Sequence, residues 1–144
     1  MKVLVVCTGN TCRSPMAGGL LREIAHSRGV NIDVRTAGLA HHHGKRVAEN
    51  AVTVMAELGI DISEEYSKPV RAQDLNWADI VLPVQRDHAE HLIEDFPDAA
   101  PKIRFLENDV PDPYLGPVTE YREKRDVLAD LLSRFVESLH PPAS

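Results

Sequence analysis

The hydrophobic positions of the chain alternate between two spacings. Short apolar runs that are typical of strands occur at Val3–Val6, Ile32–Thr36, Ile80–Leu82 and Ile103–Leu106. Segments typical of helices follow these runs, most of them with apolar residues at a helical period and one of them, with His88, His91 and Leu92, largely polar. Strands that alternate with helices predict an α/β fold with a parallel sheet, because parallel strands need long crossover connections. We therefore expect four parallel strands with helices on both faces of the sheet.

Local signals mark where the helices begin and end. Ser14 suits an N-cap, Pro15 suits the first helical position, and Gly29 ends the first helix. Gly59 closes the second helix at a position that favours a left-handed backbone. Three prolines within residues 107–118 predict a surface loop. The helix that follows is amphipathic, and its apolar face is marked by Tyr121, Leu128, Leu131, Leu132 and Phe135.

Length and composition narrow the class of protein. The chain has 144 residues, of which 43% are hydrophobic and 26% charged, as in an ordinary globular domain. We expect one domain over residues 1–144. The net charge of −6 predicts neither nucleic acid nor a membrane as a partner. The first apolar run is too short for a signal peptide or a membrane span, so we expect a cytoplasmic protein.

The first strand leads directly into a loop with candidate chemistry. Ligands bind beyond the carboxyl ends of the strands in an open parallel sheet, and Cys7 is the residue that follows the first strand. The start of the next helix and the guanidinium of Arg13 would both stabilise a thiolate at this position. Gly9 allows a positive φ and Asn10 tolerates the left-handed region, so the turn can aim backbone N–H groups at an anion.

These features predict a phosphate-binding loop with Cys7 as the nucleophile. Arg13 supplies a planar fork for two phosphoryl oxygens, which leaves a direction open for in-line attack by the sulfur. The alternative is that Cys7 is a buried structural residue at the end of a strand. The residues that we expect to form the phosphate-binding loop are Thr8, Gly9, Asn10, Thr11, Cys12, Arg13 and Ser14.

The reaction also needs a proton donor for the leaving group and a base for water, and one carboxyl can serve as both. Asp112 lies in the proline-rich loop, where it could reach over the pocket, and Asp109 is the competing candidate. Cys12 is the second cysteine of the chain. It either packs within the loop or acts as a resolving thiol that forms a disulfide with oxidised Cys7.

The run Val3–Ala17 resembles the signature of the low-molecular-weight protein tyrosine phosphatase family. Thr36–Gly38, Leu58–Asp61 and Asp112–Tyr114 resemble other segments of that family, so the similarity spans nearly the whole chain. The resemblance implies a hydrolase that acts on a phosphorylated protein and releases inorganic phosphate. In the family, the residues that match Cys7, Arg13 and Asp112 form the phosphocysteine, bind the phosphoryl oxygens and act as the general acid. The residue that matches Ser14 steadies the thiolate, and the one that matches Asn10 holds the loop in shape.

Departures from the family pattern bear on the substrate. Thr11 stands where many tyrosine-specific members have isoleucine, and this loop resembles the branch that hydrolyses phosphoarginine. A threonine hydroxyl can favour a guanidinium over a phenyl ring, so we expect phosphoarginine slightly ahead of phosphotyrosine. Tyr114 could stack on an aromatic ligand, which keeps phosphotyrosine open. Pro83–Gln85 and Glu65 or Tyr66 replace other residues that are common in the family, so the support of the loop is not settled by the resemblance.

Two other classes of protein could carry such a loop. A related arsenate reductase would need cysteines downstream of Cys12, and the sequence has none. A phosphate-binding module without catalysis, or a phosphocysteine carrier, would need no acid such as Asp112. We expect no cofactor and no metal, because the adjacent side chains of His41–His43 point different ways. His88 and His91 lack a third ligand and are expected on a surface helix.

Overall fold

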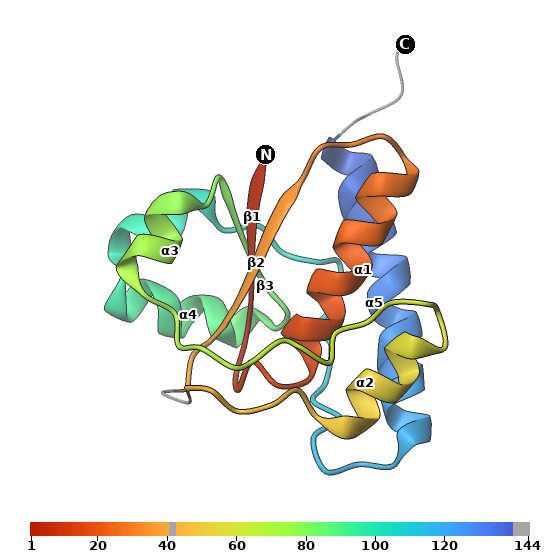
Figure 1. Cartoon of the computed structure of the whole chain (residues 1–144). Coiled ribbons are helices and arrows are strands. Elements are labelled where there is room, and N and C mark those ends of the chain that lie inside the picture. The colour runs from red at the N-terminus through yellow and green to blue at the C-terminus, as the bar shows by residue number, and fades with distance from the viewer. Residues whose placement is uncertain (41–42, 140–144) are drawn as a thin grey trace.

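The computed structural model describes residues 1–40 and 43–139. Within these residues the sheet has three parallel strands, in the order β2-β1-β3. The central strand β1 (Lys2–Cys7) pairs with β2 (Asp33–Gly38) on one side and with β3 (Ile80–Pro83) on the other (Figure 1). Residues 3–6 of β1 are completely buried, as expected for a strand that is covered on both faces.

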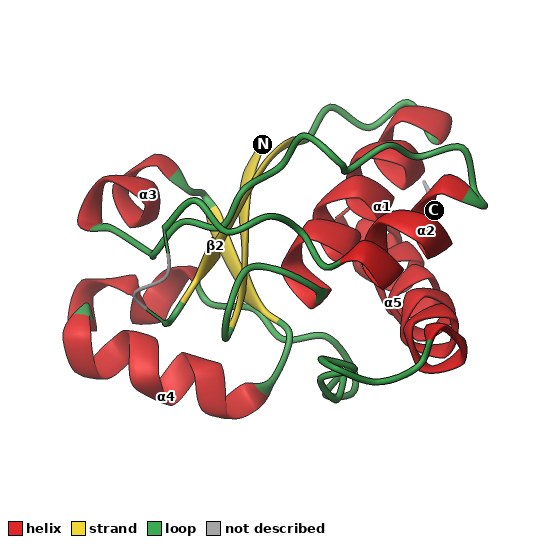
Figure 2. Ribbon diagram, turned by 60° about the horizontal axis from the view of Figure 1, so that its bottom comes forward, coloured by secondary structure: helices red, strands yellow, loops and turns green. Residues whose placement is uncertain are grey.

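Helices cover the two faces of this sheet (Figures 1 and 2). Val3 and Val5 point into a core with the first set of helices, and Leu4 and Val6 point into a core with the second. The first set is α1 (Arg13–Ser27), α2 (Glu49–Ala56) and α5 (Val118–Leu139). The second set is α3 (Ala72–Trp77), α4 (Arg86–Asp95) and the 3-10 helix η1 (Pro97–Lys102). The prediction of an α/β fold with helices on both faces is confirmed.

The prediction of a fourth strand at Ile103–Leu106 is wrong. This segment meets the sheet in one isolated bridge between Ile103 and Val81, next to a hydrogen bond from Arg104 N to Val81 O of 2.9 Å. The pairing stops there because β3 ends at Pro83, which has no N–H to continue a ladder. Phe105 then turns outward, where the guanidinium of Arg86 lies 4.6 Å from the centre of its ring.

Some helix boundaries also differ from the expectations. Ser14 does not cap α1, because the helix already begins at Arg13 and the Ser14 side chain turns toward Cys7. The helix α3 was not expected, since its six residues are too few to show a clear apolar period. Gly59 follows α2 with a φ of 75°, which confirms the expected left-handed turn.

Two glycines allow β2 to lie directly against the first loop and α1. A Cβ atom on Gly38 would lie 2.9 Å from the carbonyl oxygen of Thr8, which is shorter than the distances that Cβ atoms keep from their neighbours in proteins. A Cβ atom on Gly18 would lie 2.8 Å from Cγ2 of Thr36. The end of β2 is therefore held against the loop that follows β1, and Thr36 comes within reach of that loop.

The longest helix, α5, is amphipathic, with its apolar side against α1 and α2. None of the helices in residues 1–40 and 43–139 is both long and apolar enough to cross a lipid bilayer. The proline-rich segment before α5 forms a loop, as its composition predicts. It crosses back toward the carboxyl ends of the strands, where the candidate site lies.

Candidate active site

Cys7 ends the central strand, and its sulfur lies within hydrogen-bond distance of two groups. The backbone N–H of Asn10 donates to Sγ over 3.2 Å, and the hydroxyl of Ser14 lies 3.0 Å from the same atom. Asn10 Nδ2 donates to Ser14 Oγ over 2.7 Å, which leaves the Ser14 proton free to point at the sulfur. The Asn10 N–H and the Ser14 hydroxyl are thus placed to donate hydrogen bonds to the sulfur.

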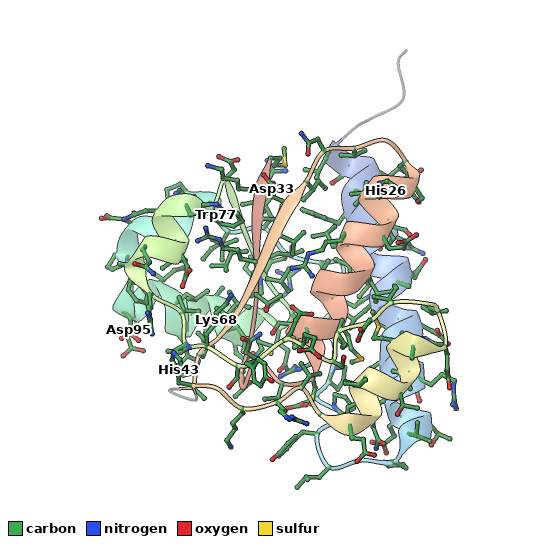
Figure 3. The ribbon with its side chains drawn as sticks, in the orientation of Figure 1. His26, Asp33, His43, Lys68, Trp77 and Asp95 are labelled. Atoms are coloured by element: carbon green, nitrogen blue, oxygen red, sulfur yellow. The ribbon has the colours of Figure 1, made fainter. Side chains whose placement is uncertain are left out.

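Asn10 holds this loop in its conformation. Its φ of 56° lies in the left-handed region, and the residue is only 1% exposed. Its side chain also donates to Thr36 Oγ1 over 2.9 Å and accepts from the backbone N–H of Lys68 over 3.0 Å. The loop is thus tied to β2 and to the segment around Lys68, which Figure 3 shows near the carboxyl end of β2. The expected tolerance of Asn10 for the left-handed region is confirmed, whereas Gly9 does not use a positive φ.

The guanidinium of Arg13 is buried behind the pocket, with 2% of the residue exposed. Nη1 donates to Oε1 of Gln85 and, over 2.7 Å, to the carbonyl oxygen of Val110. Nη2 donates to Thr8 Oγ1 over 3.3 Å and lies 3.7 Å from Oδ2 of Asp112. One edge of the fork is therefore anchored in the protein, while the other edge faces the pocket.

The structure separates the two candidate acids. Asp112 lines a pocket of about 220 Å³ together with Cys7 and Arg13, and its side chain is 42% exposed. Its Oδ1 accepts the backbone N–H of Tyr114 over 3.0 Å, which holds the carboxyl over the pocket. Asp109 instead accepts the backbone N–H of Arg86 over 2.9 Å at the start of α4, and it does not line this pocket. The loop thus brings Asp112, and not Asp109, to the cysteine.

Most of the other predicted residues line the same pocket, namely Thr8, Gly9, Thr11, Cys12 and Tyr114. Asn10 and Ser14 do not line it, because they are buried beneath Cys7 and act on its sulfur from below. The Thr11 hydroxyl lies 3.8 Å from Cys12 Sγ, which is a weak contact. Tyr114 is 56% exposed at the rim.

Cys12 is buried, and its sulfur lies 3.4 Å from the hydroxyl oxygen of Tyr121. Burial raises the pKa of Cys12, and the hydrogen bond to Tyr121 opposes this effect only in part. Burial and the contact with Cys12 likewise raise the pKa of Tyr121. Cys12 is therefore held as a thiol beside the same pocket that contains Cys7.

Four polar residues at the site were not assigned a role from the sequence, namely Lys45, Arg46, Gln85 and His88. Lys45 and Arg46 line the pocket from the loop after β2, and both are exposed. The expectation that His88 lies on the surface is wrong, because it is 3% exposed and lies against Thr8. Gln85 follows β3 at the same edge of the sheet as Cys7, and His88 comes one helical turn later, so the rule that located Cys7 also indicated this segment.

Potential metal ligands are spread out in the described part of the chain. Among residues 1–40 and 43–139, no three His, Cys, Asp or Glu side chains are grouped so that they could hold a metal ion. His43 is exposed, and His41 and His42 lie outside the described residues.

The carboxyl ends of the strands thus carry a Cys-x5-Arg loop with a carboxyl group across the pocket, an arrangement that defines the class of cysteine-dependent phosphatases. The chain belongs to the low molecular weight phosphotyrosine protein phosphatase family, which it matches over residues 2–142. It is therefore a hydrolase of the protein phosphatase class, and the resemblance seen in the sequence is confirmed.

Similar proteins carry two different activities in their names. A protein-arginine-phosphatase from Geobacillus stearothermophilus is 34% identical over 145 residues, which cover 96% of this chain and 95% of that protein. A low molecular weight protein-tyrosine-phosphatase, Ptp, from Acinetobacter johnsonii is 34% identical over 116 residues, which cover 78% of this chain and 79% of that protein. A mutant of the YwlE arginine phosphatase with a phosphorylated active-site serine has a similar structure. It shares 32% identity with a TM-score of 0.94, over 99% of this chain and 97% of that one.

Proposed function

We propose that the chain is a protein phosphatase that acts through a phosphocysteine on Cys7 and prefers phosphoarginine to phosphotyrosine. The observation that carries this proposal is the sulfur of Cys7, which has two hydrogen-bond donors beneath it and shares one pocket with Arg13 and Asp112. The phosphorylated serine in the YwlE mutant supports a covalent intermediate on the nucleophile. Cys7, Arg13 and Asp112 are the residues to which we assign the catalytic roles.

In the first step, the thiolate of Cys7 attacks phosphorus and forms the S–P bond. The P–N bond of phosphoarginine, or the P–O bond of phosphotyrosine, breaks, and the leaving atom takes a proton from the carboxyl of Asp112. The Nη2 edge of Arg13 faces the pocket and can bind phosphoryl oxygens, while Gln85 and Val110 hold the other edge still.

In the second step, the Asp112 carboxylate takes a proton from water, and the water oxygen attacks phosphorus. The S–P bond breaks and its electron pair returns to the sulfur. Inorganic phosphate is released, and the regenerated thiolate again accepts hydrogen bonds from Asn10 and Ser14. One carboxyl thus serves both steps, which fits its partial exposure at the pocket mouth.

Thr11 supports the preference for phosphoarginine. Thr11 lines the pocket and its hydroxyl has a weak contact with Cys12, so we infer that the hydroxyl accepts a hydrogen bond from a guanidinium N–H. A phenyl ring offers no such donor. The similarity of the chain to the protein-arginine-phosphatase from Geobacillus stearothermophilus also supports this preference. A cytoplasmic location, expected from the sequence, would suit a nucleophilic thiol, because the cytosol keeps thiols reduced.

Tyr114 favours a second candidate, phosphotyrosine. Its ring is exposed at the rim of the pocket and could stack on the phenyl ring of a substrate. A phosphate-binding module or a phosphocysteine carrier would use the same loop without repeated turnover, so that Cys7 would be labelled once.

The test compares phosphate release from two peptides of the same sequence, one with phosphoarginine and one with phosphotyrosine. Wild type, Cys7→Ser and Thr11→Val are measured side by side. We expect repeated turnover that needs Cys7 and a higher kcat/KM for phosphoarginine. Thr11→Val should lower the phosphoarginine-to-phosphotyrosine ratio about fivefold, because one net hydrogen bond contributes about 1 kcal/mol. Turnover in Cys7→Ser would overturn the mechanism, and a higher value for phosphotyrosine in wild type would overturn the substrate preference.

A further inference from the structure

His88 is a buried residue of α4 that touches the phosphate-binding loop. It is 3% exposed, and its Nε2 lies 3.1 Å from Oγ1 of Thr8. Its other ring nitrogen, Nδ1, is buried and has no hydrogen-bond partner among the described residues. His88 belongs to α4, which lies on the face of the sheet opposite to α1 (Figure 1).

The missing partner at Nδ1 indicates which nitrogen carries the proton. A neutral imidazole has one N–H and one bare nitrogen. If the proton were on Nδ1, a buried N–H would have no acceptor, and Nε2 would need the Thr8 proton. With the proton on Nε2, the N–H donates to Thr8 Oγ1 and the unpaired atom Nδ1 is an acceptor. A buried acceptor without a partner costs less free energy than a buried N–H without one. The geometry therefore favours the Nε2–H tautomer.

This tautomer determines the direction of the Thr8 hydroxyl. Thr8 Oγ1 can accept two hydrogen bonds, and it would accept one from His88 Nε2 and one from Arg13 Nη2 at 3.3 Å. Its single proton is then left to donate elsewhere. Thr8 lines the pocket with Cys7 and Arg13, so that proton is directed to the space where a phosphoryl oxygen would bind.

We propose that His88 is a positioning residue that locks the Thr8 hydroxyl as a hydrogen-bond donor to the phosphoryl group. The inference rests on the proposed function, because it assumes that this pocket binds phosphate. His88 acts through Thr8 and does not touch the substrate. The surroundings keep the ring neutral: burial and the charge of Arg13 lower the pKa of His88, as does His91, and Asp87 and Asp109 oppose this effect.

The first experiment determines the tautomer in the wild-type protein. Nitrogen-15 NMR of histidine-labelled protein separates the two ring nitrogens, and the His88 signals are assigned by their loss in His88→Gln. We expect a neutral ring with its proton on Nε2 near neutral pH. A proton on Nδ1, or a charged ring, would overturn the inference.

The second experiment measures binding of inorganic phosphate, which does not depend on turnover. His88→Phe keeps a ring but removes the donor, and it should weaken phosphate binding about fivefold, as for one lost hydrogen bond. His88→Gln keeps a donor and should recover most of the affinity. His91→Gln, an exposed residue on the same helix, is the matched control and should bind as wild type does.

A double-mutant cycle separates positioning from loss of structure. If His88 acts through Thr8, Thr8→Val should cost much less in the His88→Phe background than in wild type. Independent, additive effects of the two substitutions would overturn the inference, as would unchanged phosphate binding in His88→Phe. If wild type binds phosphate and the cycle shows coupling but neither peptide is turned over, the inference stands and the proposed function fails.

Discussion

The hydroxyl oxygen of Ser14 lies 3.0 Å from the sulfur of Cys7, and it accepts a hydrogen bond from Asn10 over 2.7 Å. The acceptor role of the hydroxyl toward Asn10 leaves its proton to the sulfur. Ser14 is completely buried, so no water replaces this donor when the side chain is removed. The serine that the sequence suggested as a helix cap is thus a partner of the Cys7 sulfur.

Ser14→Ala should make Cys7 less reactive. A hydrogen bond to a charged group contributes about 1.5–3 kcal/mol, so the rate of alkylation by iodoacetamide at mildly acidic pH should fall roughly 10- to 100-fold. Ser27→Ala, at the other end of the same helix, is the control. An unchanged alkylation rate in Ser14→Ala would show that the hydroxyl does not stabilise the thiolate.

Asp112→Asn should slow turnover, because the amide can neither donate the proton to the leaving group nor accept one from water. The loss in kcat should be about 10²- to 10⁴-fold for substrates with poor leaving groups and smaller for activated aryl phosphates. Asp109→Asn is the matched control, since Asp109 binds the start of α4 and not the pocket. An equal loss in the two variants would contradict the assignment of the acid.

Lys45 and Arg46 should attract the anionic substrate to the pocket. Their backbone is held by hydrogen bonds between Lys45 and Ser67, so the two side chains start from a fixed segment. The variant with Lys45→Glu and Arg46→Glu should raise KM roughly tenfold at low salt, because each exposed charge contributes up to about 1 kcal/mol to the binding of an anion. The effect should be smaller at high salt, because salt screens exposed charges. Arg104→Glu, an exposed change outside this pocket, should leave KM unchanged. A KM that rises equally at low and high salt would argue against an electrostatic cause.

Cys12 should protect Cys7 if it acts as a resolving thiol. Peroxide would oxidise Cys7 to a sulfenic acid, and attack by the Cys12 thiolate would form a disulfide and expel hydroxide, which takes a proton to become water. Because burial raises the pKa of Cys12, this step should become faster as the pH rises. After peroxide and then a thiol reductant, wild type should recover a larger fraction of its own starting activity than Cys12→Ser. Equal recovery would support the alternative, in which Cys12 only packs within the loop.

Glu57 should contribute to stability in a pH-dependent way. Hydrogen bonds from Arg122 and Arg125 of α5 lower the pKa of Glu57 to about 2, which is below the pKa of a glutamate in the unfolded chain. Since the pKa is lower in the folded state, the contribution is fully present above the unfolded pKa of about 4.3 and is lost as the pH falls toward the folded value. The Tm of Glu57→Gln should therefore lie below that of wild type at neutral pH, and the difference should shrink in acid. Glu64→Gln, in the exposed loop after α2, is the control, and a Tm difference that does not change with pH would contradict this account.

The local features of the site followed from the sequence because they depend on neighbouring residues. Cys7, Asn10 and Arg13 lie in one short loop, so a strand before them and a helix after them already bring them together. The α/β class followed from the apolar pattern, since a strand buried on both faces is a nearly continuous apolar run, as at Val3–Val6. The absence of a fourth strand could not be predicted, because the apolar run at Ile103–Leu106 has the pattern of a strand. Its pairing with β3 ends only because Pro83 has no N–H for the next hydrogen bond.

The contacts across the chain were decided by the tertiary structure. Asp109 and Asp112 are equivalent in a proline-rich loop until the fold places one at the start of α4 and the other over the pocket. His88 lies 80 positions from Thr8, and its helix carries enough polar residues to suggest a surface position. The sequence by itself determined the α/β class and the loop from Cys7 to Arg13, because these depend on local order and burial. Only the packing of distant segments decided which acid, which cations and which histidine meet that loop, because such contacts depend on distances that no local pattern encodes.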